Sequence, residues 1–418
     1  MPKNGFSWYE GDLSVKNILK LLENSNETSD IGFSLKVDIA YPKSLHDDHN
    51  DLPYLPERII PTGSKIKKLV ANLKPKKNYV VHYMALKQAL KAGLILEKVH
   101  RVLKFNQSPW LAKYIELNTN MRKNASNDFE KDFFKLMNNA VFGKTMENVR
   151  NRMNLKLVSD EKACTKLINR NTFKDIKIYN NNLVAVHLFM DVLKFDKPIY
   201  AGFSILDISK TLIYDFHYNC MVKSYGADIQ LMYTDTDSLI YYIKTADFYA
   251  DLTNKPNILN RMDTSNFPTS LPCFCNDRKK VPGTFTDETF GEIIEEFIAL
   301  RAKSYAYKIV GQEEKIKAKG IRGHPDRGRE MAVEQFKHTG CPTNEYTPFR
   351  VNISLRSYKH EVKTISTIKL ALNRKDDKRV VLENQINTLA HGHFRIEEAE
   401  ELEREDVELV EMMEGCEY

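Results

Sequence analysis

Hydrophobic and polar residues alternate between positions 33 and 41, which predicts a strand that is buried on one face. Successive side chains of a strand point to opposite faces, so Phe33, Leu35 and Val37 share one face while Asp38 lies on the other. Pro42 ends the run because proline lacks the backbone N–H of a sheet ladder. The pattern therefore presents Asp38 on the polar face, where a carboxylate can meet solvent or a metal ion.

A second alternating stretch predicts a hairpin. Positions 229–233 alternate, positions 239–243 form a hydrophobic run, and the segment between Thr234 and Ser238 is short and polar. Asp235 and Asp237 then lie at the tip, and carboxylate oxygens are the ligands that Mg²⁺ prefers. A solvated surface turn explains this stretch equally well, since aspartate is common in turns.

The segment from Arg122 to Arg152 has helical spacing and is expected to form two helices that break near Gly143. Lys131, Lys135 and Asn139 are four residues apart, and a step of four drifts only about 40° around a helix. Lys123 lies eight positions before Lys131. Such a polar stripe suits a triphosphate, although a solvated lysine face is the simpler interpretation.

The remaining segments complete an α/β interpretation, with helices on one face of an antiparallel sheet. Helices are expected from Tyr83 to Leu94 and from Pro198 to Gly226. We expect an irregular insertion at 153–195 and a loop at 253–282. A strand and a helix are expected at 285–302, followed by a strand rich in lysine and tyrosine at 303–308. Further on we expect a strand with a basic face at 315–319 and a hairpin around 376–377. The segment 46–51 contains His and Asp but is interpreted as a loop, because its spacing fits no regular metal site.

Charge and composition narrow the choice of function. The 418 residues carry a formal charge of +6, yet 397–418 holds eleven acidic residues and one arginine, so the rest of the chain is strongly basic. That balance suits a polyanionic partner. The six cysteines lack zinc-site spacing and are expected to be reduced thiols. No glycine-rich phosphate loop, signal peptide or membrane-spanning run is present, so we expect an intracellular protein without a membrane partner.

Four motifs follow one another in a set order, and together they resemble motifs A, B and C and the Lys-x-Tyr motif of family B DNA polymerases. The likeness is strongest to the protein-primed branch, including its Polinton/Maverick transposon-type and viral members, and it runs from about residue 5 to residue 395. The motifs are Asp38-Ile39-Ala40-Tyr41-Pro42, Lys135-Leu136-Met137-Asn138-Asn139-Ala140-Val141-Phe142-Gly143-Lys144, Tyr233-Thr234-Asp235-Thr236-Asp237-Ser238 and Lys303-Ser304-Tyr305.

This resemblance implies a right-hand fold with an antiparallel palm sheet, helical fingers and a small thumb. It implies a DNA-directed DNA polymerase that uses two Mg²⁺ ions, with Mn²⁺ as a substitute. The implied partners are primed DNA, deoxynucleoside triphosphates and a terminal priming protein, and the implied location is a nucleus or a viral replication site. Asp38 and Asp237 would be the principal metal ligands, Asp235 a supporting carboxylate, and Tyr41 the ring that discriminates the sugar. The implied substrate-binding residues are Lys123, Lys131, Lys135, Asn139, Phe142 and Gly143 for the nucleotide, and Lys303 and Tyr305 for the primer terminus.

The corresponding domain boundaries are a leader at 1–30, palm at 31–107 and 196–310, fingers at 108–150, an insertion at 151–195, a thumb-like region at 311–396 and an acidic tail at 397–418. The chain departs from the family pattern in three motif positions. Motif A is two residues short between Asp38 and Tyr41, Thr234 replaces a glycine, and Phe142 replaces a tyrosine. Only 37 residues precede Asp38, so a proofreading exonuclease domain is not expected. The alternative is an inactive transposon relic that binds DNA; a reverse transcriptase is disfavoured because such enzymes carry adjacent aspartates.

Overall fold

The computed structural model describes residues 1–62, 64–318, 349–358, 361–370, 376–384 and 386–399. Helices and strands are mixed along the whole described chain, as expected for the α/β class. No helix in these ranges is long and apolar enough to cross a bilayer.

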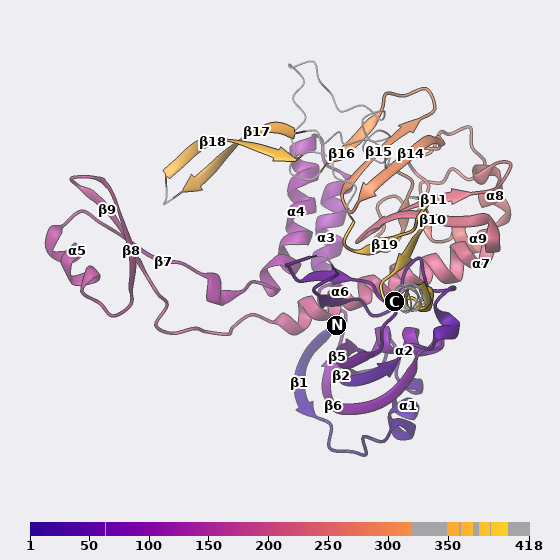
Figure 1. Ribbon diagram of the computed structural model, residues 1–418, viewed down its shortest axis with the longest axis horizontal. Coiled ribbons are helices and arrows are strands. Elements are labelled where there is room, and N and C mark those ends of the chain that lie inside the picture. Colours follow the sequence, from indigo (N-terminus) through magenta and orange to yellow (C-terminus); the bar gives the residue numbers. More distant parts are fainter. Residues whose placement is uncertain (63, 319–348, 359–360, 371–375, 385, 400–418) are drawn as a thin grey trace, which may run out of the picture.

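A four-stranded antiparallel sheet organises the first quarter of the chain (Figure 1). Its strands, in spatial order, are β1 (Pro2–Trp8), β6 (Ile95–Gln107), β2 (Ile31–Ala40) and β5 (Lys76–His82). The predicted alternation holds in β2, where Phe33, Leu35 and Val37 are buried and Asp38 is on the opposite face. Helices α1 (Val15–Glu23) and α2 (Tyr83–Lys91) contribute Ile18, Leu86 and other side chains to the same core, which burial of apolar surface stabilises.

Two antiparallel helices follow, α3 (Ala112–Lys123) and α4 (Asp128–Thr145). The predicted break near Gly143 is wrong, because Gly143 lies inside α4 and the break falls at 124–127. Asn127 caps α4 by accepting from the N–H of Glu130, and the Glu130 carboxylate accepts from the N–H of Ser126. These reciprocal bonds satisfy the free N–H groups of the first turn and fix where the second helix begins.

The helix predicted between Pro198 and Gly226 is confirmed as a nearly continuous rod. It comprises α6 (Ile199–Tyr214), a π-helical stretch η3 (Asp215–Val222) and α7 (Lys223–Tyr225), followed by a short 3₁₀ turn, η4 (Gly226–Asp228). Gly226 has φ of 56°, a backbone conformation that glycine adopts without the strain of a Cβ, and the helical direction ends there. In Figure 1, α6 lies between the four-stranded sheet and the helices α3 and α4.

Residues 153–195 are regular rather than irregular, which corrects the prediction for this segment. A three-stranded antiparallel sheet forms here in the order β7 (Asn154–Val158), β9 (Leu183–Leu188), β8 (Phe173–Asn180), with helix α5 (Glu161–Ile168). The segment extends away from the rest of the chain as an arm (Figure 1). Its hydrophobic strand positions are short and interrupted by charges, so their alternation was missed.

The other strands described up to residue 318 form small sheets. The predicted hairpin is confirmed as β10 (Ile229–Asp235) and β11 (Ser238–Ile243), which pair antiparallel. The other strands form separate ladders: β3 (Glu57–Ile59) with β4 (Lys68–Val70), β12 (Met262–Asp263) with β13 (Phe285–Thr286), and β14 (Ile294–Arg301) with β15 (Ser304–Ile309) and β16 (Lys315–Ala318). Helix α8 (Phe248–Asn254) ends just inside the predicted loop region 253–282, and the short helix α9 (Pro256–Leu259) lies within it. The helix expected within 285–302 is a strand.

Near its end the described chain forms two ladders, β17 (Phe349–Tyr358) with β18 (Glu361–Leu370) and β19 (Arg379–Val381) with β20 (Thr388–Ala390). The hairpin predicted around Asp376-Asp377 is wrong, since both residues precede β19 rather than join two paired strands. Lys319 and the acidic tail from residue 400 onward lie outside the described residues.

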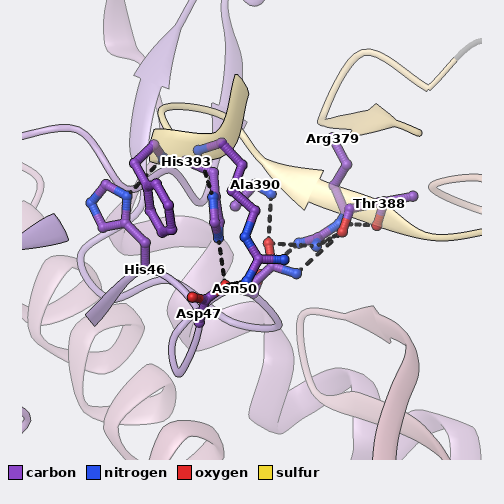
Figure 2. A network of polar contacts seen from close by, with 9 residues as sticks. His46, Asp47, Asn50, Arg379, Thr388, Ala390 and His393 are labelled. Carbon is purple, nitrogen blue, oxygen red and sulfur yellow. Dashed lines mark hydrogen bonds and ion pairs between the residues drawn. The ribbon is translucent and has the colours of Figure 1, made fainter. Parts of the chain in front are cut away.

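The segment 376–395 folds back onto the loop predicted at 46–51 and closes it with polar contacts (Figure 2). Arg379 donates to the carbonyl oxygen of Asn50 (2.9 Å) and to its Oδ1 (3.2 Å), and Ala390 N–H donates to the same Oδ1 (2.8 Å). Phe394 N–H donates to Nδ1 of His46 (3.0 Å). His46 and Asn50 therefore hold the C-terminal segment, which supports the loop interpretation of this stretch.

Buried neutral histidines make the fold sensitive to acid. Burial lowers the pKa of His49 to about 4, of His82 to about 3 and of His217 to about 4, against an ordinary value of 6.5. The unfolded chain therefore binds more protons than the folded chain as the pH falls from 6.5 towards 4, and stability is lost across that window. We expect the midpoint of thermal unfolding to fall by about 5 °C or more between pH 7 and pH 5. Equal midpoints at the two pH values would contradict this account.

Candidate active site

The tip of the β10–β11 hairpin presents two carboxylates on a rigid turn. Asp235 pairs with Ser238 across the ladder, and Asp237 N–H donates to the carbonyl oxygen of Asp235 (2.7 Å). Thr236 has φ of 63°, the left-handed conformation that a two-residue hairpin turn requires. The backbone of this turn places Asp235 and Asp237 on either side of Thr236.

Lys303 approaches this turn from another sheet. Its Nζ lies 2.8 Å from Oδ2 of Asp235, and its backbone N–H donates to the hydroxyl of Tyr233 (2.7 Å). The hydrogen bond with Asp235 is the largest cause of the raised pKa of Lys303, and the charges of Asp235 and Asp237 act in the same direction. Lys303 has φ of 64° at the turn between β14 and β15, so a strained backbone fixes the lysine where it meets the hairpin.

Aromatic rings join the same two elements. The ring centroids of Tyr233 and Tyr305 are 4.6 Å apart, and Phe297 packs against both rings. Burial raises the pKa of Tyr305 to about 12, so the hydroxyl stays protonated at neutral pH. The structure thus brings together Asp235, Lys303 and Tyr305, which the sequence linked only through motif order.

Asp38, which was expected to bind a metal ion, is hydrogen-bonded within the protein instead. Its Oδ1 accepts from Asn78 N–H (2.6 Å) and lies 2.9 Å from Nε2 of His100. The bond from Asn78, whose backbone is left-handed at φ of 54°, is the largest cause of a lowered pKa of Asp38, followed by the bond with His100. The carboxylate is therefore engaged within the four-stranded sheet.

The predicted gathering of Asp38 with Asp235 and Asp237 is not seen. Among the residues that the structure describes, no three His, Cys, Asp or Glu side chains lie close enough to hold a metal ion together. The carboxylate of Asp38 is instead taken up by hydrogen bonds with Asn78 and His100 of its own sheet.

Tyr41 is a core residue, which corrects its expected position beside a sugar. It is 5% exposed, and a hydrogen bond of 2.9 Å joins its hydroxyl to Nδ1 of His49. The hydroxyl also accepts from Tyr54 N–H (3.3 Å). The side chain stabilises the loop that carries His49 and presents no free hydroxyl to a nucleotide.

The polar stripe of α4 lies on the solvent side of the helix. Lys131, Lys135 and Asn139 are all exposed, and Lys131 pairs with Asp128 one turn earlier (2.9 Å). Gly143, also exposed, has open space around the position of a Cβ, while Phe142 is partly buried next to it. Lys123 ends the neighbouring helix α3. Cationic and amide groups thus lie along one exposed side of α4, with Lys131 already paired to Asp128.

The roles of two residues near this site were not predicted from the sequence. Tyr233 was predicted only as a strand residue, yet its hydroxyl accepts from Lys303 N–H and so positions that lysine. Its place two residues before Asp235 could have indicated a role at the site. Lys280 lies beside the end of α3, with its Nζ 3.4 Å from the carbonyl oxygen of Arg122. A separation of 158 residues left no local pattern to reveal this contact.

About half of the chain matches a known protein family. Residues 12–217, a little under half of the chain, match the family described as DNA polymerase type B, organellar and viral. No curated protein sequence matches the chain. The matched segment contains the four-stranded sheet apart from β1, the helices α3 and α4, and the arm. The match agrees with the family B resemblance over this part of the chain.

Solved structures show the fold. The DNA polymerase of phi29 in complex with primer-template DNA aligns with a TM-score of 0.50 at 13% identity, over 88% of this chain and 54% of that chain. The same polymerase with primer-template DNA and incoming nucleotides gives 0.49 at 15% identity, over 89% and 55%. The chain spans about half the length of that polymerase. Residues 12–217 are therefore similar to the type B DNA polymerases, organellar and viral, and the chain shares the fold of the phi29 DNA polymerase over most of its length.

Proposed function

We propose that the chain catalyses template-directed transfer of deoxynucleotides to a primer 3′-hydroxyl. The observation that carries the proposal is the contact between Lys303 and the Asp235-Thr236-Asp237 turn, supported by the aromatic packing behind it. In this reaction the primer 3′ oxygen forms a bond to the α-phosphorus of the nucleotide, and pyrophosphate leaves. Lys303 and Tyr305 hold the primer terminus beside the hairpin carboxylates.

The hairpin carboxylates fit a hard divalent cation. Within the described residues the Asp237 side chain accepts no hydrogen bond and forms no ion pair, so its oxygens are free for a ligand, and Asp235 adjoins it on the same turn. We assign Mg²⁺, or Mn²⁺ in its place, to Asp235 and Asp237. When bound, the metal supplies a lowered pKa at the primer hydroxyl and charge compensation at the phosphates. Asp38 has no part in this assignment.

The α4 stripe binds the triphosphate. Lys131 and Lys135 supply positive charge, Asn139 supplies an amide, and the open space at Gly143 accommodates the nascent base pair beside Phe142. Lys123 adds charge from the end of α3. The helix pair forms the fingers, and the sheets on either side of it form the palm.

Substitution of Lys135 with alanine tests this assignment. We expect the KM for deoxynucleoside triphosphates in primer extension to rise by about tenfold or more, because a charge-assisted contact to phosphate is lost. The dissociation constant for primed DNA should stay unchanged. Lys113→Ala, an exposed lysine on α3, is the matched control. Equal KM values for the two variants would remove Lys135 from the nucleotide site.

The arm and the β17–β18 hairpin are proposed to enclose DNA and to contact a priming protein. An ion pair joins Lys177 of the arm to Glu361 of the hairpin (3.1 Å). This contact supports a ring around the duplex, which would serve replication of a transposon or a virus-like element by protein priming. The boundaries of the palm, fingers, insertion and thumb-like region are part of the same proposal.

A second candidate function is DNA binding without extension, as in a transposon-derived relic. The separation of Asp38 from the hairpin favours it, because a third carboxylate is missing from the predicted metal cluster. Primer extension distinguishes the two, since a relic binds primed DNA and adds no nucleotide.

A further inference from the structure

Lys280 combines three unfavourable features that a surface lysine normally avoids. Its backbone has φ of 54°, in the left-handed region where a non-glycine residue is strained. Its side chain is partly buried. Its nearest charged side chains are mostly cations: burial is the largest cause of a lowered pKa of Lys280, followed by the charges of Arg122, Lys279 and Lys131.

The strained turn is held in place by the protein. Lys280 N–H donates to Oδ2 of Asp263 (2.7 Å), and Asp263 is 3% exposed and also accepts from Ser265 N–H (3.0 Å). The lysine is thereby presented to the end of α3, where its Nζ is 3.4 Å from the carbonyl oxygen of Arg122. A buried carboxylate on the backbone side fixes the position of the cation.

The positive charges around the contact between Lys280 and Arg122 have few acidic partners. Nε of Arg122 is buried and has no hydrogen-bond partner among the described residues. Lys131 has Asp128 as its neighbour, but Asp263 is the only acidic group among the described residues that raises the pKa of Lys280. Like charges repel, and strain and unsatisfied groups of this kind are retained where a ligand offsets them.

We propose that Lys280, Arg122 and Lys131 form a binding site for a phosphate group, closed from two sides by the 276–284 loop and the ends of α3 and α4. The inference rests on the proposed function in that the phosphate belongs either to an incoming nucleoside triphosphate or to a nucleic-acid backbone. Both sources offer the same tetrahedral oxyanion to lysine and arginine donors. The simpler role, in which Lys280 only caps the last carbonyls of α3, leaves the cluster of cations unexplained.

Binding of sodium tripolyphosphate and of an oligodeoxythymidylate, measured by titration calorimetry, tests the site without requiring catalysis. Lys280→Gly removes the charge while relieving the left-handed strain, so it should not lower the unfolding temperature. We expect it to weaken one of the two ligands by about tenfold. Weaker tripolyphosphate binding assigns the site to the nucleotide, and weaker oligonucleotide binding assigns it to the backbone.

Lys280→Arg should retain affinity because it keeps the charge, and Lys20→Ala, an exposed lysine on α1, should behave as the native chain. Unchanged affinity of Lys280→Gly for both ligands, or a native chain that binds neither, overturns the phosphate site. If the native chain binds a ligand in a way that depends on Lys280 but extends no primer, the phosphate site is supported and the proposed polymerase activity is wrong.

Discussion

Replacing Asp237 with asparagine should lower the rate of primer extension by about a thousandfold or more, while binding of primed DNA is retained. Asparagine keeps the size of the side chain and removes the negative charge that a divalent cation requires. Because the Asp237 carboxylate has no protein partner among the described residues, its replacement leaves no donor unsatisfied, and the thermal midpoint should change little. The measurement is single-turnover incorporation of one nucleotide with Mg²⁺.

Asp228→Asn is the matched control for this variant. Asp228 is exposed at the other end of the same hairpin, so the substitution makes the same chemical change away from the turn. Incorporation at the native rate is expected. If Asp237→Asn also incorporates at the native rate, the hairpin tip does not hold the catalytic metal.

The second large effect is expected on stability, from Arg379→Met. The guanidinium of Arg379 donates four hydrogen bonds, to two oxygens of Asn50 and two of Thr388. Burial lowers the pKa of Arg379, and the charges of Asp51 and Asp376 oppose that shift. Methionine keeps part of the volume but leaves these acceptors and carboxylates without their donor. We expect the free energy of unfolding to fall by about 3 kcal/mol.

Urea unfolding of Arg395→Met provides the comparison. Arg395 lies on the same C-terminal segment and pairs with Asp47 (2.7 Å), but its side chain is 58% exposed. An exposed ion pair contributes less than about 1 kcal/mol. Similar losses for the two variants would mean that the network in Figure 2 is not what holds the segment.

Features set by neighbouring residues were predictable from the sequence. Alternation identified β2 and the β10–β11 hairpin, and the step of four identified the exposed stripe of Lys131, Lys135 and Asn139. These patterns succeed because side-chain periodicity is a local property of strands and helices. The break between α3 and α4 falls at the capping pair of Asn127 and Glu130 and not at Gly143, because the side-chain caps fix where α4 begins.

Features that depend on distant parts of the chain were not predictable in the same way. The polar face of β2 is where the sequence put Asp38, but which sheet that strand joins is decided by pairing with β5 and β6. Asn78 and His100 come from those strands and occupy the carboxylate. Arg379 donates to Asn50, which lies 329 residues earlier in the chain. The sequence around either residue contains no pattern that predicts this contact.

The most direct test of the central claim is incorporation of single nucleotides by the native chain on four primed DNA templates that differ only in the first unpaired base. With Mg²⁺ present, we expect each template to direct addition of its complementary nucleotide, and Asp237→Asn to add none. Native chain that binds all four primed templates and extends none of them would contradict the proposed polymerase activity.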